Sequence, residues 1–197
     1  MKFYALILCL LVSSVVANNV SHTESQQNLS DYEIAIWTLK QYEGLHYTPY
    51  WDYSQYTIGW GTKADKDDHI DYDEANHRTR QEYQRRYNRI SKRYPKLTRF
   101  QKLVITNFNY NTPIGTQLDA ALKAGDIKKA KRIMRLYVHA GGKKLRGLVY
   151  RRNREAWLMT ATPAQRQRYG LAAKKKVIRH IEKAARRSGK ARFVSSK

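Results

Sequence analysis

Apolar residues recur at helical spacing in the first part of the chain that shows a regular pattern. Ser30 and Glu33 form the polar pair of a capping box, which marks the start of a helix. Leu39 and Glu43 lie four positions apart, so Glu43 continues the apolar stripe of that helix. Gly44 is a typical helix stop. The pattern predicts a helix that begins at Ser30 and carries Glu43 in its last turn.

The next segment, 45–62, breaks this rhythm, because aromatic residues are mixed there with proline, glycine and polar residues. Such a mixture is typical of short strands and turns. A charged loop at 63–71 follows, and the rest of the chain returns to helical spacing. The helices predicted there span 72–93, 98–111, 117–123, 126–138, 148–159 and the chain from 163. One helix, a strand lobe and then many helices predict an α+β fold with a cleft between two lobes.

Length and composition fit one folded domain with a sizeable core. The chain has 197 residues, of which 42% are hydrophobic and 27% are charged. Lys and Arg number 38 against 16 Asp and Glu, which gives a formal net charge of +22. A field of this sign favours a polyanionic partner: nucleic acid, anionic lipid or an acidic cell-wall polymer. Composition alone does not choose among them.

Residues 1–17 have the pattern of a secretory signal peptide. Lys2 precedes an uncharged apolar run, and small residues before Asn18 supply a cleavage site. We therefore predict secretion or export, with an uncleaved signal anchor as the alternative. Residues 18–28 are polar without apolar periodicity and are predicted to be a linker. Cys9 is the only cysteine and lies in the signal, so we expect no disulfide in the mature chain.

Residues 161–197 form a basic tail. From 163 onward it holds twelve Lys or Arg residues against one acid, Glu182. Val177 and Ile181 mark an apolar stripe, which predicts a basic amphipathic helix followed by a frayed polar end. The tail is interpreted either as a poorly ordered end or as a contact for anionic wall polymer or anionic lipid. We expect no nucleic-acid partner, because a secreted chain rarely meets one and no nucleic-acid-binding motif is present.

Two carboxylates are the candidates for chemistry. Asp52 follows Glu43 by nine positions and stands just before the glycine-rich strand signal that begins at Thr57. Two carboxylates across a cleft are the minimum for cleaving a glycosidic bond, because one donates a proton and the other stays charged. Taken alone, Asp52 is more often a turn residue and Thr57 a strand residue. No cofactor or metal is predicted, since the six histidines show no metal-ligand spacing.

At these residues the sequence resembles the phage-type lysozymes, or endolysins, of glycoside hydrolase family 24. That family has a glutamate, a carboxylate nine positions later and a threonine six positions after that in its active site. Glu43 and Asp52 match in type and spacing, and Thr57 matches because it precedes Ile-Gly-Trp-Gly. Thr57 comes five positions after Asp52, so the turn between them is one residue short. The resemblance implies that Glu43, Asp52 and Thr57 are catalytic.

The resemblance continues along most of the chain. Residues 70–75 resemble the start of the family's helix after the strand lobe. Residues 100–111 resemble its central buried helix, with Pro113 where the family has a glycine, and 141–155 resemble its Gly-Gly, Gly-Leu, Arg-Arg and Glu signature. The resemblance implies a lysozyme-like domain at 29–160. It also implies hydrolysis of the β-1,4 bond between N-acetylmuramic acid and N-acetylglucosamine in peptidoglycan.

The implied mechanism is inverting: Glu43 protonates the leaving oxygen while Asp52 and the Thr57 hydroxyl hold a water. Arg151 and Arg152 are interpreted as packing or ion-pairing residues outside the catalytic set. The expected partner is peptidoglycan, bound by a monomer. A second function class is a catalytically weak or inactive cationic antibacterial protein that binds wall or membrane, which the short turn and the basic tail suggest. A third is a structural or host-interaction protein on the same fold.

Overall fold

The computed structural model describes residues 28–52 and 55–187. The predicted signal peptide at 1–17, nearly all of the predicted linker at 18–28 and the predicted frayed end after 187 lie outside these residues. No helix within the described ranges is long and apolar enough to cross a membrane.

Helix α1 (Asp31–Lys40) begins with the predicted capping box. The Ser30 hydroxyl accepts from the Glu33 backbone N–H at 3.2 Å, and the Glu33 carboxylate accepts from the Ser30 N–H at 2.9 Å. The predicted helix end was wrong, because the regular helix stops at Lys40 and the next residues tighten into a turn. Glu43 lies in that turn, where its N–H donates to Leu39 O at 3.3 Å.

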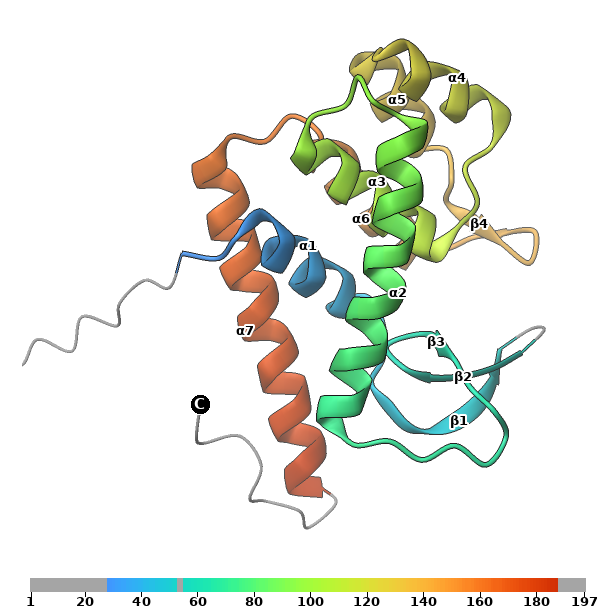
Figure 1. Cartoon of the computed structure of the whole chain (residues 1–197), viewed down its shortest axis with the longest axis vertical. Helices are drawn as coiled ribbons and strands as arrows, with labels where there is room; N and C mark the ends of the chain where they lie inside the picture. The colour runs from blue at the N-terminus through green and yellow to red at the C-terminus, as the bar shows by residue number, and fades with distance from the viewer. Residues whose placement is uncertain (1–27, 53–54, 188–197) are drawn as a thin grey trace, which may run out of the picture.

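The strand lobe consists of β1 (His46–Asp52), β2 (Gln55–Gly59) and β3 (Thr62–Lys63). They form an antiparallel sheet in the order β1-β2-β3, which confirms the predicted short strands. One face of the sheet buries Ile58 with Trp60 and Ala75, so the lobe packs on the first turns of α2. Figure 1 shows the lobe beside that end of α2.

The helical part confirms most of the predicted elements. Two helices match the predictions closely, α2 (Tyr72–Arg93) and α3 (Arg99–Asn111). The others are α4 (Thr116–Ala124), α5 (Ile127–Met134), α6 (Arg146–Leu158) and α7 (Pro163–Arg187).

Helix α5 ends at Met134, before the predicted residue 138, because the chain turns there into an unpredicted hairpin. Its strands are β4 (His139–Ala140) and β5 (Lys143–Lys144). Gly141 and Gly142 both have positive φ, 56° and 74°, which is the backbone that a two-residue hairpin turn requires.

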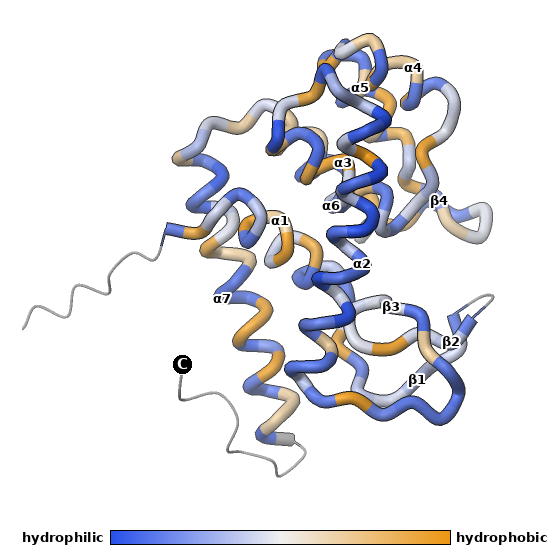
Figure 2. Tube along the Cα trace, viewed as in Figure 1, coloured by the Kyte–Doolittle hydropathy of each residue, from blue (hydrophilic) through white to orange (hydrophobic). Residues whose placement is uncertain are grey.

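The main core lies around α3, whose Phe100, Leu103 and Phe108 are almost fully buried. Figure 2 shows apolar stretches within α1 and α3, the helices that meet at this core. Helix α1 packs on α3 and on α7. The contact with α7 is close, because a Cβ built at Gly170 would lie 2.8 Å from Ile34 Cγ1. The first part of the basic tail is therefore one helix, as predicted, and it is packed against the helix that leads to Glu43.

Candidate active site

Glu43 lies where the helical part meets the strand lobe. Its side chain is 21% exposed, and Oε1 accepts a hydrogen bond from Arg151 Nη1 at 2.8 Å. Its other oxygen faces the turn after β2, because a Cβ built at Gly61 would lie 3.7 Å from Oε2. Gly61 has φ 85°, so glycine suits this position for its backbone as well as for the space. Glu43 is thus ion-paired on one side and open to the strand lobe on the other.

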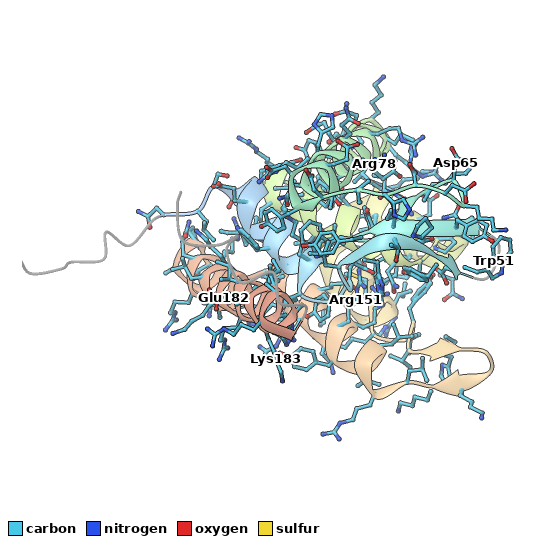
Figure 3. The ribbon with its side chains drawn as sticks, turned by 90° about the horizontal axis from the view of Figure 1, so that it is seen from below. Trp51, Asp65, Arg78, Arg151, Glu182 and Lys183 are labelled. Atoms are coloured by element: carbon cyan, nitrogen blue, oxygen red, sulfur yellow. The ribbon has the colours of Figure 1, made fainter. Side chains whose placement is uncertain are left out.

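Arg151 connects Glu43 to a buried network of charges. Its Nε donates to Glu155 Oε1 at 3.0 Å and its Nη2 to Asn107 O at 3.3 Å. Arg152 pairs with the other oxygen of Glu155. Burial alone would lower the pKa of Arg151, but the charges of Glu155 and Glu43 outweigh it, so this pKa is raised. Figure 3 shows Arg151 at the junction of the lobes.

The interpretation of Arg151 as an ion-pairing residue is confirmed, but its partner includes a candidate catalytic residue. The spacing of Arg151 and Glu155 on one helix predicts their pairing. Nothing in the sequence pattern predicts the contact with Glu43, which is 108 positions away. Arg151 therefore joins the site as the residue that holds Glu43.

Asp52 is exposed at the end of β1, where it pairs across the hairpin with Gln55. Two positions earlier, Tyr50 lies on the same face of the strand. Burial raises the pKa of Tyr50, and the negative charges of Asp52 and Glu43 raise it further. Both carboxylates are therefore within electrostatic range of the Tyr50 hydroxyl. Asp52 shares its face of the sheet with Tyr50, and Glu43 lies beside the turn that follows β2.

Thr57 is buried on β2 and pairs across the sheet with Tyr50. It therefore shares the face that carries Tyr50 and Asp52, opposite the face that buries Ile58. Its Oγ1 has no hydrogen-bond partner among the described residues. A buried hydroxyl without a partner costs about 1–3 kcal/mol, and such groups call for a functional or structural explanation. The short turn is consistent with this register, since Asp52 pairs directly with Gln55.

Comparison with protein families supplies the wider context. The model described as phage lysozyme matches residues 40–155. The chain belongs to the phage lysozyme family. No curated protein sequence matches it. The match contains Glu43, the strand lobe and the Arg151 network, and it ends before α7.

Solved structures show the same fold. The muramidase domain of SpmX from Asticaccaulis excentricus is similar with a TM-score of 0.58 and 19% identity, over 65% of this chain and 95% of that domain. The active form of the P1 phage endolysin Lyz is similar with a TM-score of 0.55 and 16% identity, over 64% of this chain and 82% of that chain. The endolysin from Escherichia coli O157:H7 phage FAHEc1 is similar with a TM-score of 0.53 and 22% identity, over 68% of this chain and 93% of that chain. These likenesses confirm the predicted α+β lysozyme-like fold.

Lys40 is a further buried charge at the lobe junction that the sequence pattern did not predict. Its Nζ lies 3.9 Å from the ring centroid of Trp60 and 5.0 Å from that of Trp37. It donates to the amide oxygen of Asn76 on α2. Burial lowers the pKa of Lys40 to about 7, and the positive charge of Arg80 acts in the same direction. Lys40 therefore joins α1 to α2 and the strand lobe.

A pocket of about 440 Å³ lies on the helical part, away from the three candidate residues. It is bounded by the start of α4, the end of α5 and the first residue of β4. Its lining consists of Gly115, Thr116, Gln117, Ile133, Leu136, Tyr137 and His139. Within the described residues, no group of His, Cys, Asp or Glu is arranged to hold a metal ion.

Proposed function

We propose that this phage lysozyme family member is a muramidase that cleaves the β-1,4 bond between N-acetylmuramic acid and N-acetylglucosamine in peptidoglycan. The observation that carries the proposal is the position of Glu43 at the lobe junction. There it is held by Arg151 on one side and faces the turn after β2 of the strand lobe on the other. Family membership supports peptidoglycan as the substrate class.

Glu43 donates its proton to the glycosidic oxygen as the bond from that oxygen to C1 breaks. Asp52 and the Thr57 hydroxyl hold a water on the opposite face of the sugar. The water oxygen bonds to C1, and its proton passes to Asp52, which is the inverting course. Arg151 then stabilises the Glu43 carboxylate that the proton transfer leaves behind. The Thr57 oxygen supports this role because it makes no hydrogen bond to another described residue; it is also buried, so the role requires the strand lobe to open toward it when substrate binds.

The test is the number of new reducing ends released from purified peptidoglycan by the parent and by Glu43→Gln. The variant keeps the size of the side chain and loses the transferable proton, so we expect at least a 100-fold loss of rate. Asp65→Asn is the matched control, because it removes a carboxylate from an exposed loop. Full activity of Glu43→Gln would show that Glu43 is not the acid.

A second candidate is a cationic binding protein with little or no turnover. Asp52 is exposed at the end of a hairpin, and the chain carries +22, which are the observations that favour it. This protein would bind wall material and release no reducing ends from it, with or without Glu43. Secretion through residues 1–17 remains part of either proposal, and the mass of the exported product would test it.

A further inference from the structure

Helix α7 has a basic face that points to solvent. Arg168, Lys175, Arg179 and Arg186 are exposed and follow one another at intervals of seven, four and seven positions. At 3.6 residues per turn, these four side chains lie along one line of the helix. With a rise of 1.5 Å per residue, this basic face is roughly 27 Å long. Figure 3 looks nearly along α7 and shows side chains projecting from it away from the rest of the molecule.

The opposite face of α7 is already used by the fold. Gly170, Ala173 and Val177 are buried, and Gly170 lies directly against Ile34. A helix that lies in a bilayer surface must insert its apolar face among the lipids. The apolar face of α7 is covered by the protein itself, so only its charges are available. This arrangement suits a polyanion that lies along the helix and not a membrane.

We propose that the basic face of α7 binds a linear anionic polymer attached to the cell wall, with repeated phosphodiester groups. The proposal rests on the proposed function in that the wall is the substrate. A polymer of this kind presents charges in a row, which matches a row of cations in charge and in shape. Binding along α7 would keep the enzyme on the wall between successive cleavages.

The test uses the full chain carrying Glu43→Gln, so that binding is measured without digestion. In the face variant, Arg168, Lys175, Arg179 and Arg186 are replaced by Gln. The control variant replaces Arg89, Lys92, Lys96 and Arg99, four exposed cations near the end of α2, so both variants lose the same charge. Sedimentation with purified wall measures binding, before and after the phosphodiester polymer has been chemically removed.

We expect the face variant to bind polymer-bearing wall at least tenfold more weakly than the parent, and the control to stay within about threefold. Four charge contacts to a flexible polyanion also predict a loss of roughly 50-fold in the parent's affinity between 50 and 200 mM salt. Equal binding by both variants would overturn the proposal. So would an undiminished affinity of the parent for stripped wall, or stronger binding to anionic lipid vesicles or to DNA than to the polymer.

Hydrolysis of stripped wall separates this proposal from the proposed function. With Glu43 intact, the face variant should digest stripped wall as fast as the parent. If the parent fails to release reducing ends there, the proposed function is wrong. Polymer binding is measured with the Glu43→Gln chain, so its result does not depend on whether the parent hydrolyses the wall.

A second inference concerns the hydrogen bonds between α7 and the residues just before Glu43. Tyr169 belongs to α7, beyond the part of the chain that the family model matches. Its hydroxyl accepts from Gln41 Nε2 at 2.7 Å and makes a hydrogen bond with the Tyr42 hydroxyl at 2.9 Å. Tyr169 therefore holds the two residues that directly precede Glu43.

The same contacts reach Arg151. The guanidinium of Arg151 lies 5.1 Å from the ring centroid of Tyr42, so that ring supports the group that holds Glu43. We infer that Tyr169 is a positioning residue for the Glu43 and Arg151 pair. It acts through Tyr42 and Gln41 and does not itself contact the candidate catalytic residues.

Tyr169→Phe tests this inference, because it removes the hydroxyl and keeps the ring that packs edge-on against Trp157 at 5.9 Å. We expect kcat on stripped wall to fall about fivefold, which corresponds to about one ordinary hydrogen bond, with KM unchanged. The alkaline limb of the pH–rate profile, which the general acid governs, should also shift. Tyr32→Phe is the control, since the Tyr32 hydroxyl bonds only weakly to Arg80 O at 3.4 Å.

An active parent with unchanged kcat and pH profile in Tyr169→Phe would overturn the inference and leave the proposed function intact. A lower melting temperature with full kcat would also overturn it, because Tyr169 would then act on stability alone. An inactive parent would instead count against the proposed function.

Discussion

The two candidate carboxylates are held in opposite ways. Glu43 lies at the edge of a buried network in which Arg151 and Glu155 are 5% and 1% exposed. Asp52 is exposed at the end of a strand, opposite Gln55. The helical part of the protein thus fixes the proton donor firmly, while the hairpin presents the second carboxylate to solvent. The difference suggests that the two sites should respond very differently to substitution.

The largest expected effect is on stability, in the network that holds Glu43. Glu155→Gln leaves Arg151 and Arg152 buried with too little negative charge, so we expect a loss of about 3–5 kcal/mol in the free energy of unfolding. Denaturant titration measures it. The control is Glu74→Gln, which breaks a more exposed ion pair with Arg78 and should cost less than about 1 kcal/mol.

Asp52→Asn should lower the rate of hydrolysis and leave the stability of the fold nearly unchanged. Asp52 is exposed, so we expect the free energy of unfolding to change by no more than about 0.5 kcal/mol. Loss of the base should lower the rate of reducing-end release by about 100-fold. A variant that loses stability but keeps its rate would contradict the contrast between the two carboxylates.

The same comparison can be made between two buried cations, Arg151 and Lys40. Arg151 has carboxylate partners, whereas the described contacts of Lys40 are an amide and aromatic rings. The pKa of Lys40 is about 7 in the folded chain against 10.5 ordinarily, so between these values the unfolded chain binds the proton and the folded chain does not. Stability from this group therefore rises with pH from about 7 to about 10 and is flat below.

Lys40→Met should remove that slope and stabilise the protein at neutral pH by roughly 1–2 kcal/mol. The gain is smaller than the pKa shift alone suggests, because the Trp60 ring favours the charged lysine. Unfolding curves at several pH values measure it. A parent whose stability does not change between pH 7 and 10 would show that Lys40 titrates normally.

The smallest expected effect is at Thr57. Thr57→Val replaces a buried hydroxyl without a partner by a methyl group, so stability should stay the same or rise by up to about 1 kcal/mol. Activity should fall about tenfold, because the water loses one of its two contacts. Thr57→Ser keeps the hydroxyl and should retain most of the rate. Equal rates in the two variants would exclude a role for the hydroxyl.

Features that depend on neighbours in the sequence were predicted well. The capping box predicted at Ser30 fixes the start of α1 and forms as the pattern requires. Helix α3 was predicted from its apolar spacing, and the structure shows that it too begins with a capping box, at Thr98. The β4–β5 hairpin was missed, because strands of two residues carry no periodic signal. The end of α5 was misplaced for the same reason: the Val138 carbonyl accepts from Leu145 N–H and extends that hairpin.

Contacts between distant positions could not be predicted. The sequence indicates that Glu43 and Arg151 belong to motifs of one family, but not that they touch. It shows Lys40 as one of 38 cations, and only the packing of Trp37 and Trp60 around it makes it a buried charge. Tyr169 lies outside the family motifs, so its place under Glu43 comes from the packing of α7 on α1 alone.

The most direct test of the division between a held acid and an exposed base is the anomeric form of the first product. Proton NMR during the digestion of peptidoglycan by the parent would follow the new reducing end before it mutarotates. A water held by Asp52 attacks from the face opposite the leaving group, so the account predicts that the α anomer forms first. A β anomer at the earliest times would mean retention, and would contradict the proposed role of Asp52.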